Sequence, residues 1–240
     1  MVEWDPKKIK KWKKGIDWIK TIINIIIINL KTFLGLNIVK EPFELIWLPP
    51  EQIRCIAKNK EDLLFSSKDL KIINMGKIKN GKWDTKEENF NKSALFISIK
   101  KKFLEGVKWE NTPIYDLAKT RIKEENKHIW TCTSIDDLDN KLDSTEALYK
   151  EIKNKGYKTQ RELGSLNRYD EIRVAISRDG EALFLEGNHR LAIAKLLDLD
   201  KIPVLVSVWH KKFIDEVKKE YPNKDLTPKF LSQFLQTNQD

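Results

Sequence analysis

The fold is decided by the stretch from Glu171 to Arg190, which reads EIRVAISRDGEALFLEGNHR. Its first six residues alternate as a half-buried strand, Arg178-Asp179-Gly180 is typical of a hairpin turn, and Ala182 to Leu185 returns as a second strand. Gly187 follows and predicts a helix from His189 to about Leu197, and Ile202 to Val208 reads as the next strand. This order of elements predicts an α/β (α+β) domain.

The turn Glu186-Gly187-Asn188-His189-Arg190 has the composition of a phosphate site. A strand that ends at Gly187 and opens a helix directs the first free N–H groups of that helix to one point, where the helix dipole favours an anion. Without a Cβ at Gly187 a phosphate can approach the main chain, and Arg190 adds a bidentate donor with His189 beside it. Two structural alternatives stay open: Asn188 caps the helix by bonding the N–H of Leu191, and His or Arg in a first turn is simply solvated.

A longer segment, Leu148 to His210, resembles the N-terminal domain of ParB-type partition proteins and the related sulfiredoxins. The resemblance rests on the helix that ends at Gly156, the strand Ile172 to Ile176, the turn at Gly180, the GNHR run and the strand opened by Ile202-Pro203-Val204. It covers about a quarter of the chain. It implies a small mixed sheet with flanking helices that binds a nucleoside triphosphate, ATP or CTP with Mg²⁺, through Gly187, Asn188, His189 and Arg190.

Three departures from those families narrow the expectation. Sulfiredoxins carry a catalytic cysteine where this chain has Asn188, and neither Cys55 nor Cys132 is near the motif, so sulfinic-acid reduction is not expected. Partition proteins have an acidic residue and two arginines where this chain has Asn188, His189 and Arg190. Residues 211–240 are too few for their DNA-binding and dimerisation domains, so a complete partition protein is not expected.

Glu186 is the best-placed carboxylate for chemistry. The resembling fold family includes ATP-dependent small-molecule kinases, and phosphoryl transfer needs a carboxylate to orient or deprotonate the acceptor. The resemblance therefore leaves open an ATP-dependent phosphotransferase with Glu186 in a catalytic or metal role, against the alternative of a solvated carboxylate at a strand end. The metal ligands are not defined. Asp179 is expected in a turn, and Asp170 and Glu171 at the start of a strand.

Two other functions remain open. One is a non-catalytic, nucleotide-switched adaptor or DNA-associated module. The other is a nuclease, which needs a cluster of metal-binding carboxylates that the sequence does not display. Loop-like Trp83 and Trp109 could stack on a base, although core packing is the commoner role of tryptophan. His128 and His210 have no partners at metal-ligand spacing and are expected to be packed residues.

The N-terminal 40 residues hold most of the positive charge. Nine lysines against Glu3, Asp5 and Asp17 give +6 of the formal +9, which leaves +3 for the other 200 residues. The run Ile25 to Ile28 lies between Lys20 and Lys31 and is too short to span a membrane. On a helix, one wide apolar arc collects Ile16, Ile19, Ile22, Ile23, Ile26, Leu30, Phe33 and Leu34, and Asp17, Lys20, Thr21, Asn24 and Lys31 form the other arc.

This amphipathic helix has two readings. It packs on its own domain or on a partner, or it lies on an anionic membrane surface with Trp4, Trp12 and Trp18 at the interface; contact with nucleic acid through the lysines is a further alternative. The predicted organisation is a basic helical extension over 1–40, the ParB/sulfiredoxin-like domain over 41–212 and a C-terminal helix or tail over 213–240. Two widely separated cysteines favour a location in the reducing cytoplasm. A peripheral position on a membrane surface is the alternative location.

Elsewhere the expected elements are a strand over Phe43 to Leu48, a turn over Gln52 to Ala57, a hairpin within Asn74 to Asp84 that turns at Asn80-Gly81, and three helices. The helices are expected over Ala94 to Phe103 with a stop at Gly106, over Tyr115 to about Glu125, and over Thr145 to Lys155 with Ser144 as its cap and Gly156 at its end.

Overall fold

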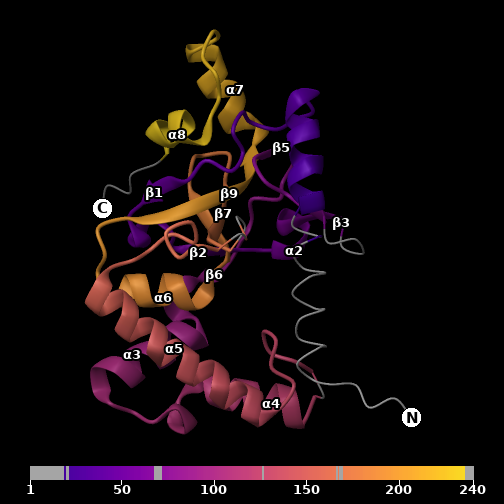
Figure 1. The fold of residues 1–240 in the computed structure, drawn as a ribbon. Helices are drawn as coiled ribbons and strands as arrows, with labels where there is room; N and C mark the ends of the chain where they lie inside the picture. Colours follow the sequence, from indigo (N-terminus) through magenta and orange to yellow (C-terminus); the bar gives the residue numbers. More distant parts are fainter. Residues whose placement is uncertain are drawn as a thin grey trace.

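The computed structural model describes residues 19, 22–67, 72–125, 127–165, 167 and 170–235. These residues form a mixed α/β fold around a seven-stranded sheet (Figure 1). Its strands are β1 (Ile46–Leu48), β2 (Cys55–Ala57), β5 (Lys77–Lys79), β6 (Lys86–Asn89), β7 (Ile172–Ile176), β8 (Ala182–Glu186) and β9 (Ile202–His210). A separate two-stranded sheet pairs β3 (Phe65–Ser67) with β4 (Ile72–Ile73).

The centre of the large sheet is β9, β7 and β8, in the order β1-β9-β7-β8-β2-β6. β7 runs parallel to β9 and antiparallel to β8, and β2 runs parallel to β8. β9 is long enough to pair with β1 at its start and with β5 at its end, so both short strands lie along the same edge. In this mixed sheet β7 pairs with a strand on each side, and its residues are buried on both faces.

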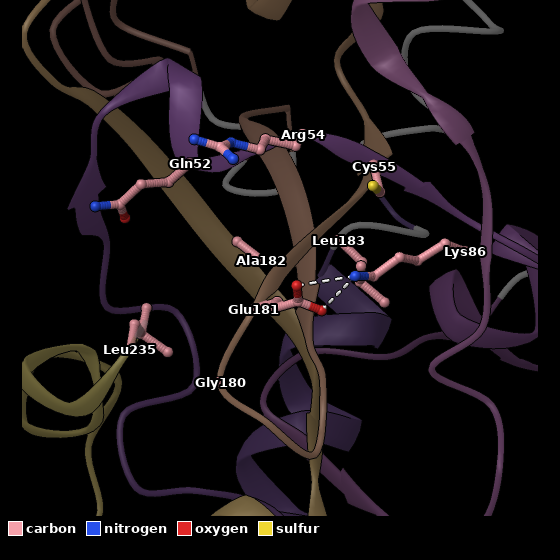
Figure 2. Close-up of a pocket in the computed structure, with 9 residues that line it drawn as sticks. All are labelled: Gln52, Arg54, Cys55, Lys86, Gly180, Glu181, Ala182, Leu183 and Leu235. Atoms are coloured by element: carbon pink, nitrogen blue, oxygen red, sulfur yellow. Dashed lines mark hydrogen bonds and ion pairs between the residues drawn. The ribbon is translucent and has the colours of Figure 1, made fainter. Parts of the chain in front are cut away.

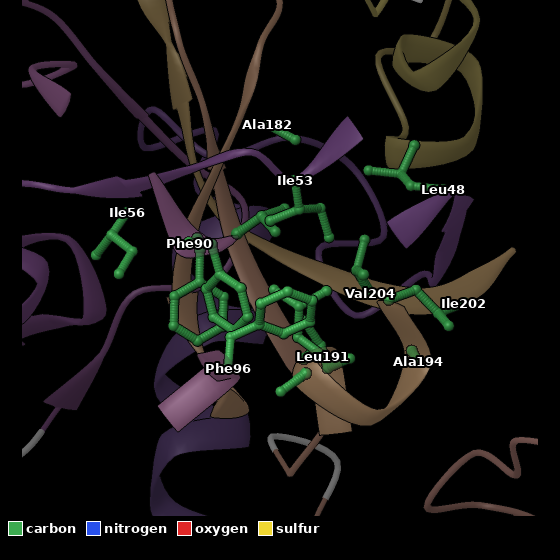
Figure 3. Packing of buried hydrophobic residues seen from close by; sticks show 14 of the residues in the cluster. Leu48, Ile53, Ile56, Phe90, Phe96, Ala182, Leu191, Ala194, Ile202 and Val204 are labelled. Carbon is green, nitrogen blue, oxygen red and sulfur yellow. The ribbon is translucent and has the colours of Figure 1, made fainter. Parts of the chain in front are cut away.

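Helices cover the two faces unequally. The helices are α2 (Lys60–Leu64), α3 (Ala94–Glu105), α4 (Pro113–Lys123), α5 (Ile135–Lys155), α6 (Asn188–Leu196), α7 (Lys211–Glu220) and α8 (Pro228–Leu231), with four short 3-10 turns, η1 (Pro50–Gln52), η2 (Phe90–Lys92), η3 (Trp109–Asn111) and η4 (Ser232–Phe234). The main core joins one face of the sheet to α6 and α3, where Phe90, Phe96, Leu191 and Ala194 pack together (Figure 3). The other face meets α2 through Leu63 and Leu64.

The predicted elements of the C-terminal half are confirmed. The strand Ile172–Ile176, the turn at Gly180, the strand Ala182–Glu186, the helix Asn188–Leu196 and the strand Ile202–His210 all form. β7 differs in burial, because all five of its residues are buried rather than alternate ones. A strand with covered faces on both sides of the sheet needs no exposed polar row.

The helices Ala94–Glu105 and Pro113–Lys123 are also confirmed, and the first ends at Gly106 as predicted. The start of α5 was predicted wrongly. This helix begins at Ile135, where Ser134 and Asp137 form a reciprocal capping box, and Ser144 lies inside it with its hydroxyl donating to the carbonyl of Asn140. A serine within a helix satisfies its hydroxyl in this way and then caps nothing.

The predicted hairpin within Asn74 to Asp84 is wrong. β5 pairs with β9, and β6 pairs with β2, so the turn at Asn80-Gly81 joins strands that do not pair with each other. The segment expected as a turn after Pro50 contains the strand β2, and only Ile46–Leu48 of the strand expected from Phe43 is formed. Long-range pairing with β9 and β8 overrides the local signals at both places.

Residues 22–33 are helical, within the segment predicted to be an amphipathic helix. This helix does not bury the side that was predicted to be apolar. Asn24, in the predicted polar arc, is buried and accepts a 3.1 Å hydrogen bond from the backbone N–H of Ile73, whereas Ile23, Ile26 and Leu30 in the predicted apolar arc are exposed. Ile16, Asp17, Lys20 and Thr21 lie outside the described residues. Among the described residues, no helix has both the length and the apolar character needed to cross a bilayer.

Candidate functional site

Gly187 is the joint between β8 and α6. Its φ of +100° lies in the region that side chains other than glycine rarely adopt, and a Cβ built there would lie 2.9 Å from Cγ1 and 3.0 Å from Cα of Ile172. The missing side chain therefore lets β7 and α6 approach closely. This packing is a different reason for glycine from the one expected, which was access for a phosphate.

The first turn of α6 is capped by main chain alone. Gly187 is the cap, its carbonyl accepts from the N–H of Leu191 at 3.0 Å, and Asn188 is already the first helical residue. The alternative in which the Asn188 side chain caps the helix is therefore wrong. The N–H groups of Asn188, His189 and Arg190 have no acceptor within the helix, which leaves the positive end of α6 available to an anion.

A β-bulge places a charged pair next to this turn. β7 and β8 are in register from Ile176–Ala182 to Val174–Phe184, and then Arg173 faces Glu186, so Leu185 is an extra residue in β8. The bulge brings Glu186 opposite Arg173, whose Nε donates to Glu186 Oε2 at 2.8 Å and whose Nη2 contacts the same oxygen. Arg173 is buried, its Nη1 has no partner, and the Glu186 side chain is about half exposed. Glu186 thus borders the site as the exposed end of a buried ion pair.

Arg190 is held by two acidic residues at the start of β7. Its guanidinium donates to the carbonyl of Asp170, donates at 2.6 Å to Asp170 Oδ1, and lies 3.7 Å from Glu171 Oε2. Glu171 is buried, and burial raises the pKa of its carboxyl although the N–H of Gln160 and the charge of Arg190 act against that rise. A ligand phosphate would compete with Asp170 for this arginine.

His189 packs under Trp130, with ring centroids 4.6 Å apart and an interplanar angle of 62°. Burial, helped by the positive charge of Lys141, lowers the pKa of His189 to about 3, and its Nε2 is buried without a partner. The imidazole is therefore neutral near pH 7, so His189 adds no positive charge to the turn. Its backbone N–H remains one of the free donors of α6.

These side chains open onto one cavity of about 800 Å³, here called the α6 cavity. It is bounded by the first turn of α6, the ends of β7 and β8, α2, α5 and the turn between Ile129 and Cys132. Its lining residues are Lys60, Glu61, Leu64, Trp130, Thr131, Lys141, Leu148, Gln160, Asn167, Asp170, Arg173, Leu185, Glu186, Gly187, Asn188, His189 and Arg190. All five residues of the predicted turn thus border the same space.

A second pocket is too small to compete with it. Figure 2 shows Arg54, Cys55, Lys86 and Glu181 around a space of about 20 Å³, across which Lys86 Nζ and Glu181 are 2.8 Å apart. Such a volume accommodates about one water molecule. The ion pair already satisfies both charges, so the α6 cavity is the candidate site.

Sequence reasoning missed the cations and the tryptophan that border the cavity beyond the turn. Arg173 was counted as a strand residue, Lys141 lies on the part of α5 that was not predicted, and neither Lys60 nor Trp130 was considered as a site residue. The two tryptophans that were considered for stacking on a base do not border the cavity. Trp109 is buried and its Nε1 donates to Glu146 Oε1 at 2.9 Å, and Trp83 packs on His210. The capping signal Ser134-x-x-Asp137 could have extended α5 to include Lys141.

His210 is buried, as expected, and caps α7. His128 is exposed, so the expectation that it is a packed residue is wrong. Within the part of the chain that the structure describes, no group of three or more His, Cys, Asp and Glu side chains is arranged to hold a metal ion. Comparison with models of protein families, with curated proteins and with solved structures gives no match for this chain.

Proposed function

We propose that the α6 cavity binds a nucleoside triphosphate, ATP or CTP with Mg²⁺, with its phosphates at the first turn of α6. One observation carries this proposal: the free N–H end of α6, the cations Lys60 and Lys141, and the aromatic ring of Trp130 border a single cavity. Its volume of about 800 Å³ lies within the range of about 300–1,000 Å³ that small-molecule sites occupy. The ParB/sulfiredoxin-like resemblance of Leu148 to His210 supports the same ligand.

The phosphate end of the ligand would meet main-chain donors and lysines. The helix dipole and the three N–H groups that have no acceptor within α6 favour negative charge at the start of this helix. Lys141 is close enough to His189 for its charge to lower the pKa of that ring, so it is near the same turn. Arg190 would bind a phosphate oxygen only after releasing Asp170. We therefore expect Arg190 to contribute less to phosphate binding than the main-chain donors and the lysines.

Trp130 is suited to the base. It occupies the first position of a two-residue turn closed by hydrogen bonds between Ile129 and Cys132, and its φ is +52°. A bulky residue rarely adopts this conformation, and strain of this kind gathers at functional sites. A tryptophan that borders a cavity offers a stacking surface for any nucleobase.

Two carboxylates at the cavity match the kind of ligand that Mg²⁺ takes from proteins. Mg²⁺ usually binds to substrate phosphates together with one or two carboxylates, and Glu186 and Asp170 are exposed carboxylates at the cavity. When bound, it would offset the charge of the phosphates.

The role of Glu186 separates two versions of the proposal. A phosphotransferase needs a carboxylate free to accept a proton, and Glu186 is engaged by Arg173. This pairing favours the second version, a non-catalytic nucleotide-binding module whose bound state is recognised by a partner. A nuclease has no support from the arrangement of carboxylates among the described residues.

Titration calorimetry with ATP, CTP and GTP, each with Mg²⁺, tests the binding proposal. Lys141→Ala is expected to weaken binding of the preferred nucleotide about tenfold, which is about 1.4 kcal/mol. Lys150→Ala removes the same charge from the same helix at an exposed position that does not border the cavity, and it is expected to leave the affinity within about twofold.

Absence of binding for all three nucleotides would show the proposal to be wrong, and so would equal effects of the two lysine substitutions. Turnover is measured separately, with Glu186→Gln as the variant. Loss of a measurable wild-type hydrolysis or transfer rate in this variant supports the phosphotransferase version, and binding without turnover in the wild type supports the module.

A further inference from the structure

The N-terminal helix, residues 22–33, has apolar side chains on two opposite sides. One side packs on the protein: Ile28 is 2% exposed and lies in a cluster with Ile73, Met75 and Leu205. Asn24 on the same side accepts the hydrogen bond from the N–H of Ile73. The inner side of the helix thus packs on β9, β4 and the residues beside them.

The opposite side is exposed. Ile23, Ile26, Leu30 and Phe33, here called the outer face, are 50–87% exposed. At about 100° per residue they fall within an arc of about 80°, centred opposite Ile28. In Figure 1 this indigo helix stands at the outside of the molecule beside β5. Leu34 and Leu36, each more than half exposed, extend the apolar surface beyond the end of the helix.

An exposed apolar surface of this kind indicates an interaction site, because its side chains are not buried in the protein's own core. The charge of the same segment identifies the partner. Residues 1–40 carry a net +6, and seven of the nine lysines, at positions 7, 8, 10, 11, 13, 14 and 20, precede the helix in the sequence. A second copy would carry the same positive charge, and like charges would oppose its contact with this surface. An anionic surface is the complement.

We propose that the outer face binds a membrane surface that carries anionic lipids, with the helix lying in the plane of the interface. Ile23, Ile26, Leu30 and Phe33 would enter the boundary between headgroups and acyl chains, and the lysines would bind the negative headgroups. Trp4, Trp12 and Trp18 belong to the residue type that is enriched at such interfaces. The inner side stays on the sheet, so binding requires no loss of the contacts of Ile28 and Asn24.

The test is co-sedimentation of the full chain with vesicles of phosphatidylcholine alone and of phosphatidylcholine mixed with phosphatidylserine. Binding is expected to the mixed vesicles, to fall as salt is raised, and to be at least tenfold weaker to the neutral ones. The double variant Ile26→Ser, Leu30→Ser is expected to lose at least tenfold in affinity for the mixed vesicles while keeping the wild-type melting temperature.

Two single variants separate this role from a structural one. Leu104→Ser changes an exposed leucine at the end of α3 and is expected to bind vesicles like the wild type. Ile28→Ala changes the inner side and is expected to lower the melting temperature while the folded protein still binds. The opposite pattern, loss of stability from the outer-face variant without loss of binding, would overturn the proposal.

Two further results would also overturn it. The first is failure of the wild type to bind mixed vesicles. The second is a concentration-dependent dimer in sedimentation equilibrium that the double variant dissociates, because the outer face would then be covered by a second copy. Neither result depends on nucleotide, so the membrane proposal and the nucleotide proposal stand or fall separately.

Discussion

His189 carries an imidazole that its surroundings keep neutral. Its pKa of about 3 is far below the ordinary value of about 6.5 because the ring is buried beside Trp130 and near Lys141. The unfolded chain therefore binds more protons than the folded one between these two values. The free energy of unfolding must fall as pH is lowered through about 6.5, by at most about 1.4 kcal/mol per pH unit.

We expect the wild type to lose about 1–2 kcal/mol more stability than His189→Gln between about pH 7 and pH 5. Urea unfolding at several pH values measures the difference. Glu171, whose raised pKa acts in the opposite direction, is present in both proteins, so its contribution cancels. Parallel stability curves for the two proteins would show that His189 is accessible to protons in the folded state.

At the residue scale, the sequence predicted that Glu186 to Arg190 lie together but not how their side chains are paired. The order strand, glycine, helix was sufficient to bring Glu186 to Arg190 to one cavity. Arg190 pairs with Asp170 and Glu171, and Glu186 pairs with Arg173 because the bulge at Leu185 brings these two residues opposite each other. A bulge changes the register by one residue, and no local sequence pattern in β8 predicts this bulge.

The junction between β8 and α6 is the element on which the site depends. Gly187→Ala would force a Cβ to within 3.0 Å of the Ile172 main chain and would place alanine at a φ of +100°. We expect a loss of about 2–5 kcal/mol in the free energy of unfolding, from about 1–3 for overpacking and about 1–2 for the backbone conformation. Denaturant unfolding measures it.

Gly106→Ala is the matched control, because Gly106 also has a positive φ, at a helix end, but has open space where its Cβ would be. This variant should show the backbone cost alone, about 1–2 kcal/mol. If the two variants lose the same stability, the contact between Gly187 and Ile172 does not constrain the junction.

Elements with strong local signals were predictable, and elements defined by distant pairing were not. α3 has a capping Ser93 and ends at Gly106, and both signals are contained in its own sequence. β5 and β6 pair with β9 and β2, which are about 30 residues or more away in the sequence, so the turn signal between them suggested a hairpin that does not form. The N-terminal helix was predicted to have one apolar side, and Ile28 and Ile26 show that it has two.

In the whole molecule, the α6 cavity collects side chains from four distant parts of the chain. Lys60 comes from α2, Trp130 from a turn, Lys141 from α5 and Arg173 from β7. Their meeting follows from the sheet order, in which β8 lies between β7 and β2. Only Arg173 lies within the stretch that predicted the fold, which is why the sequence indicated a phosphate turn but not the cavity around it.

The central claim is that this cavity receives a nucleotide at the first turn of α6. A crystal structure with a non-hydrolysable ATP or CTP analogue and Mg²⁺ tests it most directly. We predict phosphate oxygens within about 3 Å of the backbone nitrogens of His189 and Arg190, with the base against Trp130. A nucleotide bound elsewhere on the protein, or bound with its phosphates away from this turn, would contradict the account.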